Sequence, residues 1–490
     1  MQVHRGAAPP CVHDGPVHVA EQDPTTATRS RWTLPVVAPW VLATALAVVY
    51  CVISISRLQR YATRSWDLAI FEQVVRGYAW LEGPIVDVQG PGANFFGDHF
   101  SPALAVLAPL YRLLPFTETL LVAQALLIAG SVLIVTRLGV RHLGDAAGLG
   151  IGLAYGLSWG VQSAVDFDFH EVALAVPLLA LAGAAYVDRE FRRTALWAAP
   201  LVLVKEDLAL TVAAVGVVLL LAGAVRLGLG LVVGGSLAFV LATVVVIPAF
   251  NAEGIYRFWP EGTGSGGLLS TLVGLPWAMV SSGTKIETLL LVLAVTAFLA
   301  LRSPWVLVAV PNLVVRFASD NDNYWSTDWH YSLTTMTVVF VALVDAIVRV
   351  RRSGPGWLRA YSAHVPVAAV AVALVLCLQF PFRALVDPLT YDGGQRVVNA
   401  DAVLDRIPEE ASVASDIGLL SELVGERDVY WIGSDNRGVE PDYVLLDGPG
   451  AWGGTAPAGV AHAEQRFPGA TYEPVLAAGG FQLMRRVDPG

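Results

Sequence analysis

The stretch ALWAAPLVLVKEDLALTVAAVGVVLLLAGAV, residues 195–225, is apolar except for Lys205, Glu206 and Asp207. As a single helix it would be about 46 Å long, which exceeds the roughly 30 Å hydrocarbon core of a bilayer. Three ionisable groups at the bilayer centre would also cost about 2.5–3.5 kcal/mol each. We therefore predict two helices that meet at a polar break on one membrane surface. A plain hairpin turn is the alternative, but the first arm is too short to span without burying Lys205.

The whole chain has the composition of an integral membrane protein. Of its 490 residues, 55% are hydrophobic and only 15% are charged, and the mean hydropathy is +0.58. Lipid offers the backbone no hydrogen-bond partner outside a helix or a closed barrel. We therefore predict an all-α polytopic membrane bundle of about eleven transmembrane helices, near residues 34–56, 118–136, 146–164, 172–187, 194–206, 207–225, 228–249, 286–301, 304–318, 333–348 and 363–380.

Positive charges in short loops indicate how the predicted helices are oriented. Counting spans places these charges on one side, which we assign to the cytoplasm: Arg137, Arg141, Arg189, Arg192, Arg193, Arg226, Arg302, Arg349, Arg351, Arg352 and Arg359. Residues 1–32 then form a disordered cytoplasmic leader. Residues 101–116 are expected to be an interfacial or re-entrant helix. If they crossed fully, the first loop would change sides, and Arg57, Arg60 and Arg64 would suit that alternative.

After a transmembrane domain of residues 33–382, residues 383–490 indicate a small extracytoplasmic α/β domain. This region has 17 acidic and 8 basic residues, so it carries nearly all of the net charge of −10. QRVVNADAVLDRI predicts an amphipathic helix, and ASVAS, DVYWIG and DYVLLDG predict short strands. YEPVLAAGGFQLMRRV predicts a hairpin around Gly479 and Gly480. The region has no cysteine, which excludes a disulfide framework, and the chain has no basic footprint for nucleic acid.

Polar and aromatic loops fall on the side opposite the arginines. They are WDLAIFEQ (66–73), GDHF (97–100), DFDFHE (166–171), KED (205–207) and NDNYWSTDWHY (321–331). Each has a simpler interpretation: Asp67 as a helix N-cap, DFDFHE as a polar turn, and 321–331 as a hydrated loop anchored by Trp325 and Trp329. Several such loops on one face, each with Asp, Glu or His, favour a shared polar cavity instead.

These motifs also carry a resemblance. WDLAIFEQ, GDHFSPALAVLAPLYRLLP, FDFHEVALAVPLL, LVKEDLAL, VPNLVVRF with a following HY, and the tail from IPEEASVAS to DYVLLDG resemble, in order, a family of prokaryotic predicted membrane proteins of unknown function. That family is similar to the GT-C superfamily, the polytopic glycosyltransferases that use polyprenyl-phosphate sugars. The resemblance covers roughly residues 34–486.

The resemblance implies transfer of a sugar from a polyprenyl-phosphate donor to an acceptor on the extracytoplasmic face. Such a reaction needs a carboxylate that takes the acceptor's proton and cationic groups that stabilise the departing phosphate. We expect catalytic roles for Asp67, His99 and Glu171. The residues expected to bind the donor phosphate or substrate are Lys205, Glu206, Asp207, His170, His330, Tyr331 and Gln73.

Some features stay open at this point. GT-C enzymes usually have paired acids in the first loop, whereas Trp66 precedes Asp67 and the next acid is Glu72. A divalent metal ion, the identity of the base and the acceptor are therefore undecided. The alternative function is a multi-pass transporter or ion-coupled carrier, which predicts an inverted repeat and charges at mid-depth. A third is a membrane-anchored assembly protein without catalysis.

Overall fold

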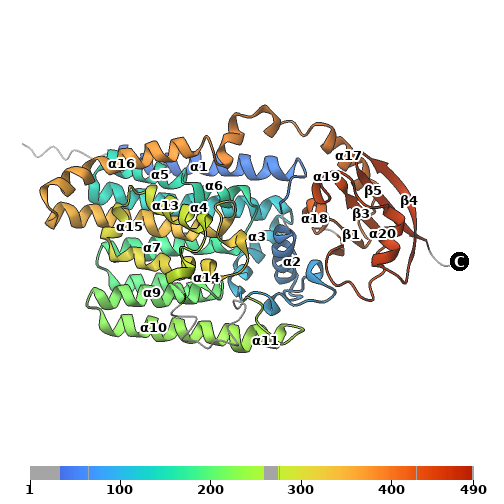
Figure 1. Ribbon diagram of the computed structural model, residues 1–490, viewed down its shortest axis with the longest axis horizontal. Helices are drawn as coiled ribbons and strands as arrows, with labels where there is room; N and C mark the ends of the chain where they lie inside the picture. The colour runs from blue at the N-terminus through green and yellow to red at the C-terminus, as the bar shows by residue number, and fades with distance from the viewer. Residues whose placement is uncertain (1–33, 65, 259–273, 275, 426, 488–490) are drawn as a thin grey trace, which may run out of the picture.

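The computed structural model describes residues 34–64, 66–258, 274, 276–425 and 427–487. The predicted leader, 1–32, lies outside the described residues. A bundle of roughly parallel helix axes occupies most of the molecule, and a small unit with a sheet lies at one end of it (Figure 1). We call this unit, from α17 to β5, the C-terminal unit. The end of the bundle next to it is the proximal end, and the opposite end is the distal end.

Within the described residues, five helices are long and apolar enough to cross a membrane. Two are α1 (Leu34–Leu58) and α4 (Thr117–Leu143). A third begins as α10 (Val225–Val240) and continues through a π-helical stretch into α11 (Ile247–Phe250). The last two are α15 (Leu333–Ser353) and α16 (Gly356–Leu376). The chain is therefore a multi-pass membrane protein.

The other predicted spans are helical but shorter or interrupted, so a count of eleven is not confirmed. They contain α5 (Asp145–Gly156), α6 (Trp159–Asp166), α7 (Ala175–Val187), α8 (Phe191–Ala198), α9 (Leu208–Leu221), α13 (Gly283–Ala294) and α14 (Val310–Ala318). The 195–225 run breaks as predicted. A 3-10 turn (Ala199–Leu203) follows α8, the chain is non-helical at Lys205, and α9 begins at Leu208.

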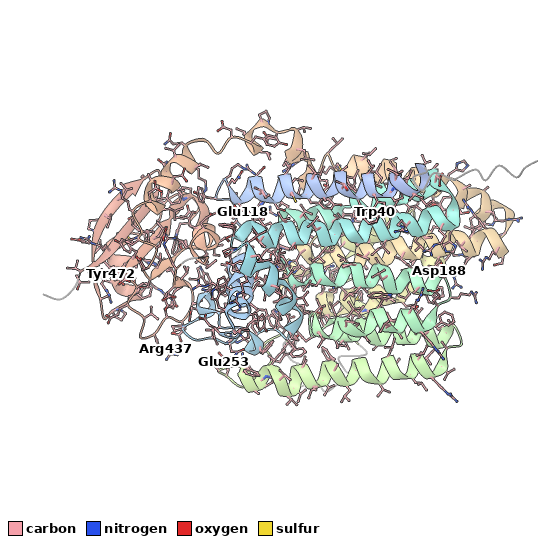
Figure 2. The ribbon with its side chains drawn as sticks, turned by 180° about the vertical axis from the view of Figure 1, so that it is seen from behind. Trp40, Glu118, Asp188, Glu253, Arg437 and Tyr472 are labelled. Atoms are coloured by element: carbon pink, nitrogen blue, oxygen red, sulfur yellow. The ribbon has the colours of Figure 1, made fainter. Side chains whose placement is uncertain are left out.

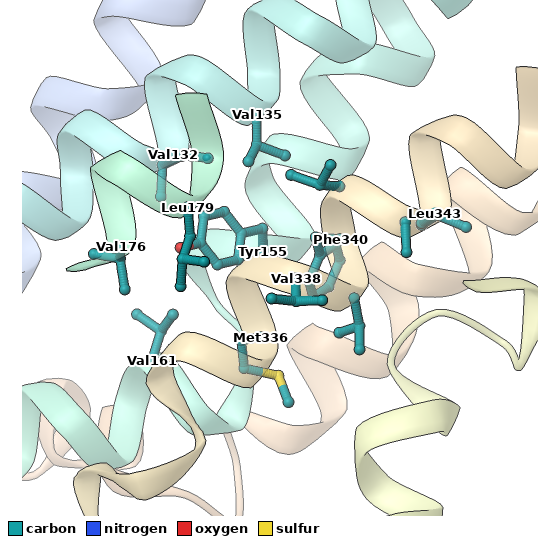
Figure 3. Close-up of a cluster of buried hydrophobic side chains, with 14 of the residues drawn as sticks. Val132, Val135, Tyr155, Val161, Val176, Leu179, Met336, Val338, Phe340 and Leu343 are labelled. Atoms are coloured by element: carbon teal, nitrogen blue, oxygen red, sulfur yellow. The ribbon is translucent and has the colours of Figure 1, made fainter. Parts of the chain in front are cut away.

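The centre of the bundle is built around α15. Every residue from Leu333 to Ile347 is buried, because α15 packs against α4, α6, α7 and the 3-10 turns before α14. Figure 3 shows part of this core, where Met336, Val338 and Phe340 of α15 lie among apolar side chains of α4, α5, α6 and α7. A helix that is buried on all sides, as this one is, is typical of the interior of a bundle.

Two short helices lie between the bundle and the C-terminal unit (Figure 1). They are α2 (Asp67–Trp80) and α3 (Ala108–Leu113), and a 3-10 turn (Pro102–Leu107) precedes α3. The helical segment Pro102–Leu113 is about 20 Å long, too short to cross roughly 30 Å of hydrocarbon. Its length supports the interfacial or re-entrant prediction for residues 101–116.

The C-terminal unit contains the predicted helix, strands and hairpin, together with the further helices α18, α19 and α20. Its elements are α17 (Gly394–Leu404), β1 (Val413–Ser415), α18 (Ile417–Leu423), β2 (Val429–Trp431), β3 (Tyr443–Asp447), α19 (Gly448–Ala451), α20 (Gly459–Arg466), β4 (Thr471–Ala478) and β5 (Phe481–Val487). The strand order is β2-β1-β3-β5-β4. β1 is parallel to both of its neighbours, and β5 is antiparallel to β3 and β4. Gly479 and Gly480 turn the final hairpin with φ of 55° and 93°, which glycine adopts easily.

The C-terminal unit packs directly on α2. Leu68 and Val74 of α2 share one apolar core with Leu420 and Leu423 of α18. Arg76 donates from its guanidinium to the carbonyl oxygen of Val424 at 2.7 Å. α2 is therefore held between the bundle and the sheet.

The distal end carries the predicted arginines. The Asp188 carboxylate, at the end of α7, lies 2.8 Å from a guanidinium nitrogen of Arg141 and 2.7 Å from Nε2 of His142, at the end of α4. These contacts join the distal ends of α4 and α7. Figure 2 shows Asp188 at the end away from the C-terminal unit, whereas Glu118 and Glu253 lie close to that unit. The bundle thus separates a basic end from an end with acidic and aromatic loops, as the sequence predicts.

Candidate active site

Separate loops bring the predicted polar residues together at the proximal end. Asp67 begins α2, and His99 follows it in the first loop. His170 and Glu171 lie between α6 and α7, and Lys205 lies just before α9. Residues 330 and 331 immediately precede α15. Each group therefore sits where a helix of the bundle starts or ends.

The carboxylate of Asp67 faces two stacked histidines. Its Oδ2 lies 3.5 Å from Nε2 of His170. The rings of His170 and His330 stack with centroids 3.6 Å apart and planes at 20°, and Phe167 stacks on both. The Nδ1 atoms of both histidines are buried and have no hydrogen-bond partner within the described residues. The Asp67 side chain is 30% exposed, so a substrate can reach it.

An ion pair joins the segment between α6 and α7 to the break before α9. Lys205 Nζ lies 2.7 Å from Glu171 Oε1, and the Glu171 side chain is fully buried. A buried carboxylate and a buried ammonium each need a partner of opposite charge. An ammonium has three donors, so Lys205 keeps donors beyond the one that faces Glu171. Next to it, burial raises the pKa of Asp207 to about 6, although Lys205 lowers it.

Glu206 turns away from Lys205 toward the first loop. Its Oε1 lies 2.8 Å from Nδ1 of His99, and its Oε2 accepts the backbone N–H of Phe100 at 3.1 Å. Burial and Lys205 disfavour protonated His99, but Glu206 and Asp98 raise its pKa to about 9. Burial disfavours ionised Glu206, but His99 and Lys205 lower its pKa to about 2. The pair is therefore charged on both sides at neutral pH.

Tyr324 lies near this cluster, and the sequence analysis did not single it out. Burial raises the pKa of Tyr324, and the charges of Lys205, Asp98, Asp67 and Glu206 all act on its hydroxyl group. The ring also contacts Tyr331 edge to face, with centroids 4.8 Å apart. The first loop, the break before α9 and the 321–331 loop thus converge on one phenol. Its position inside NDNYWSTDWHY was the only signal in the sequence.

Arg316 is a second residue that the sequence analysis missed. It is 4% exposed, and it donates to the carbonyl oxygens of Tyr324 and Ser326 and to Oγ of Ser332 at 2.8–3.1 Å. Its guanidinium also lies 5.7 Å from the ring of Tyr331. No ion pair with a carboxylate is found for it in the described part of the chain. In the sequence, VPNLVVRF has the pattern of the end of an apolar span. That pattern gave little indication that the charge of Arg316 would be buried at the site.

Gln73 is the predicted site residue that the structure does not bring to the cluster. Its Oε1 accepts the backbone N–H of Val88 at 3.1 Å, and its Nε2 donates to the carbonyl oxygen of Val429 in β2 at 3.3 Å. Gln73 is six residues from Asp67, which turns it about 120° away around a helix. Helical geometry therefore directs it to the C-terminal unit.

The described residues hold no group of three or more His, Cys, Asp or Glu side chains arranged to ligate a metal ion. The acids of the cluster are instead paired with bases: Asp67 with His170, Glu171 with Lys205, and Glu206 with His99. This donor set does not provide a preformed divalent-metal site.

Comparisons with known proteins agree with this architecture. A family model described as "Predicted membrane protein (DUF2079)" matches residues 57–474. No curated protein matches the chain. Among solved structures, the chain is similar to the crystal structure of ArnT from Cupriavidus metallidurans bound to undecaprenyl phosphate. The TM-score is 0.51 at 14% identity, over 92% of this chain and 98% of that one. At this identity the likeness concerns the fold alone.

Proposed function

The chain belongs to the DUF2079 family of predicted membrane proteins, and from this premise we propose that it is a GT-C-type glycosyltransferase. In this proposal it moves a sugar from a polyprenyl-phosphate donor to an acceptor at the extracytoplasmic membrane face. The observation that carries the proposal is the convergence of Asp67, His170 and Lys205 from three separate loops at one end of the bundle. The ArnT structure, which contains undecaprenyl phosphate, supports the choice of donor class.

The transfer step assigns one role to each part of the cluster. The acceptor hydroxyl attacks the anomeric carbon of the sugar, and the Asp67 carboxylate takes its proton. The bond from the anomeric carbon to the phosphate oxygen breaks, and its electron pair stays on the lipid phosphate. His170, 3.5 Å from Asp67, holds the carboxylate in place as a positioning residue. Because the general base must be reachable, the partial exposure of Asp67 suits this role.

Lys205 is the first candidate for stabilising the departing phosphate. Its ammonium has donors beyond the one facing Glu171, and Glu171 fixes it at the edge of the cluster. Arg316 is the second candidate because it is buried, charged and close to Tyr331. A lipid-linked donor requires a site at helix ends, where the lipid tail stays in the bilayer while the sugar reaches polar groups. The location of the cluster meets this requirement.

The C-terminal unit has a supporting role in this proposal. We place residues 33–382 in the transmembrane domain and residues 383–490 in an extracytoplasmic domain that holds α2 from outside. The contacts of Trp431 with Trp66, at 4.3 Å between ring centroids, and of Val429 with Gln73 support this role. Both partners flank Asp67 in sequence, so docking of the unit fixes the start of α2.

Transfer is tested with purified full-length protein, radiolabelled polyprenyl-phosphate sugars and membrane extract as the acceptor source. We expect label to move from at least one donor into an acceptor fraction, and we expect Lys205→Ala to slow this step by about 100-fold or more. Arg193→Ala is the control, because Arg193 is exposed at the distal end, where it contacts Glu190 at 2.8 Å. Proton-coupled uptake of a solute without transfer from any donor would contradict the proposal.

Sidedness is tested by cysteine labelling in a variant without Cys11, Cys51 and Cys377. Asp435→Cys lies on an exposed site of the C-terminal unit, and Arg351→Cys lies on an exposed site of the distal end. A membrane-impermeant thiol reagent should label position 435 in intact cells and position 351 only after permeabilisation. Labelling of both positions from the same side would contradict the proposed topology.

A further inference from the structure

A pocket of about 740 Å³ opens at the proximal end of the bundle. Its walls come from the end of α1 and the chain after it, from α13, from residues 327–328 and from the segment after α16. Its volume lies within the roughly 300–1,000 Å³ that is typical of small-molecule sites. None of the acid–base pairs of the candidate active site lines it. The pocket is therefore large enough to hold a ligand, or a part of a substrate, outside the cluster.

The charged side chains that line the pocket balance one another. Four are guanidinium groups, those of Arg57, Arg60, Arg64 and Arg383. Four are carboxylates, those of Asp166, Glu287, Asp328 and Asp387. A ligand with a net charge of either sign would face as many groups that repel it as groups that attract it. The wall therefore favours a ligand without net charge.

Part of this polar wall is fixed, and part of it is unused. Arg57 and Arg64 both contact Asp166, at 3.0 and 3.1 Å, so these three groups hold one another in place. Two exposed side chains of the wall, by contrast, form no hydrogen bond or ion pair with another described residue: Arg383 and Glu287. A guanidinium offers only donors, and an ionised carboxylate offers only acceptors. The pocket thus presents both kinds of hydrogen-bonding group to a ligand.

Hydroxyl groups suit this wall, because a hydroxyl group donates one hydrogen bond and accepts others. An anion would use only the guanidinium groups, and an ammonium would use only the carboxylates. The pocket also has an apolar side, formed by Ile53 of α1, Leu291 of α13 and the half-buried Phe380 after α16. A sugar ring has hydroxyl groups along its edge and an apolar C–H face that packs on an aromatic ring. A neutral carbohydrate therefore matches the charge balance, the hydrogen-bonding groups and the apolar side of the pocket.

The pocket lies beside the candidate active site because the same segments of the chain build both. The segments that supply Asp67, His170 and His330 to the cluster also supply residues to the pocket wall: Arg64, Asp166 and Asp328. The guanidinium of Arg64 lies 5.8 Å from the ring of Trp329, and Trp329 contacts Phe167 edge to face with centroids 4.6 Å apart. Phe167 in turn stacks on both histidines. A chain of contacts thus connects the pocket wall to the histidines that face Asp67.

We infer that this pocket binds an uncharged carbohydrate chain, held by Arg383 and Glu287 and packed on Phe380. Its place beside the cluster gives this chain the role of the acceptor, the compound whose hydroxyl group receives the sugar. The acceptor role rests on the proposed function, whereas the binding of carbohydrate rests on the pocket alone. The lipid phosphate of the donor then belongs to Lys205, and the two substrates occupy separate places.

Binding to the full-length protein in phosphatidylcholine nanodiscs tests this inference, with saturation-transfer NMR as the measurement. The neutral probes are tetrasaccharides of mannose, glucose, galactose and N-acetylglucosamine. The comparison probes are an acidic tetragalacturonate, a basic tetramer of glucosamine and a glycine–serine tetrapeptide with blocked ends. We expect at least one neutral tetrasaccharide to bind more tightly than both charged probes and the peptide.

Glu287→Ala combined with Arg383→Ala should weaken that binding about tenfold or more, because it removes a charged acceptor and a charged donor. Both side chains are exposed, so the change leaves no buried charge without a partner. Glu190→Ala combined with Arg193→Ala is the matched control, since these residues form an exposed ion pair of 2.8 Å at the distal end. It removes one charge of each sign as well, and it should leave the dissociation constant unchanged.

The absence of binding by every neutral tetrasaccharide, or an unchanged dissociation constant in the Glu287 and Arg383 double variant, would overturn the inference. Tighter binding of a charged tetrasaccharide would overturn the assignment to an uncharged ligand, and tighter binding of the peptide would overturn the assignment to carbohydrate. No donor is present in this measurement, so a failed binding site and a failed transfer assay give different results. Protein that binds the glycan but transfers no sugar to it would contradict the acceptor role and leave the binding site in place.

Discussion

At the scale of single residues, the cluster consists of charge pairs that each join two loops. Lys205 pairs with Glu171 and Glu206 pairs with His99, rather than with neighbours in sequence. Buried pairs of this kind give uncertain net stability because desolvation opposes their attraction. They do fix geometry, because removing one partner leaves the other charge buried alone. The pairs therefore position the proximal loops around Asp67.

His99→Ala is expected to destabilise the protein by about 3–5 kcal/mol at pH 6, since it leaves the buried Glu206 carboxylate without its main partner. Folding raises the His99 pKa from its ordinary value of about 6.5 to about 9. The stabilising contribution is therefore complete below about pH 6.5 and is lost as the pH rises through 9. Denaturant unfolding of wild type and variant between pH 6 and 9.5 measures this difference.

The control for this prediction is His364→Ala, because His364 is exposed on α16 at a distance from the cluster. It should change the free energy of unfolding by less than about 0.5 kcal/mol. A difference between wild type and His99→Ala that stays constant over the whole pH range would show that His99 does not act through its charge.

The sequence predicted which residues gather here but not their partners. Pattern and charge placed Lys205, Glu206 and Asp207 at a break, because a helix of that length cannot keep three charges in lipid. The direction of each side chain depends on which distant loop packs next to it, and no local pattern encodes that. Arg316 was missed for the same reason. Its charge is compensated by backbone oxygens of a loop that follows it by 8–10 residues.

At the scale of elements, close helix contact depends on particular glycines. Gly139 of α4 and Gly148 of α5 face each other, and a Cβ atom added to Gly148 would lie 2.1 Å from the backbone nitrogen of Val140. A Cβ atom at Gly150, on the same helix, would be in ordinary van der Waals contact with a methyl group of Val370 at 3.6 Å and the carbonyl oxygen of Pro366 at 3.8 Å. Small residues let membrane helices approach this closely.

Gly148→Ala should therefore force α4 and α5 apart and destabilise the protein by about 1–3 kcal/mol. Gly150→Ala should be neutral or slightly stabilising, because alanine favours helix. Thermal unfolding in detergent compares the two variants. Equal melting temperatures for both would contradict the packing described for this pair of helices.

The contact between α2 and the C-terminal unit contains a pH-sensitive group. Glu72 is fully buried, and its Oε1 accepts the hydroxyl group of Tyr111 at 2.8 Å. Burial raises its pKa to about 7; Thr117, Tyr111 and Arg76 lower it, and Glu118 raises it further. On the facing helix α18, burial together with Glu118, Glu72 and Asp401 raises the pKa of Glu422 to about 8. Carboxylates from both sides of the contact thus approach each other.

Because the folded state holds a proton on Glu72 more tightly than the unfolded state, the contribution of Glu72 to stability is complete below about pH 4.5 and is lost as the pH rises through about 7. Glu72→Gln imitates the protonated form, so it should stabilise the protein by about 1–3 kcal/mol at pH 8 and have little effect at pH 4.5. Glu82→Gln, at an exposed site just after α2, is the control. Identical pH profiles for wild type and Glu72→Gln would contradict this interpretation.

At the scale of the whole molecule, the chain joins a helical bundle, similar in fold to ArnT, to a small α/β unit. The sequence predicted the bundle, the break at residues 205–207 and the strands and hairpin of the C-terminal unit. It could not fix the number of spans, because helices such as α9 and α14 are shorter than a span and α13 gives way to non-helical backbone at Ala297 and Phe298. Hydropathy reports burial in lipid or protein, but not where a helix ends.

In the proposed function, Asp67 acts as the base of a sugar transfer at the proximal end. The most direct test is the initial rate of transfer from a polyprenyl-phosphate sugar by wild type, Asp67→Asn and the control Asp145→Asn, whose side chain is exposed at the start of α5. Asp67→Asn should lower the rate by about 10²–10⁴-fold while the protein stays folded, and the control should be unchanged. A folded Asp67→Asn protein with the wild-type rate would contradict the claim.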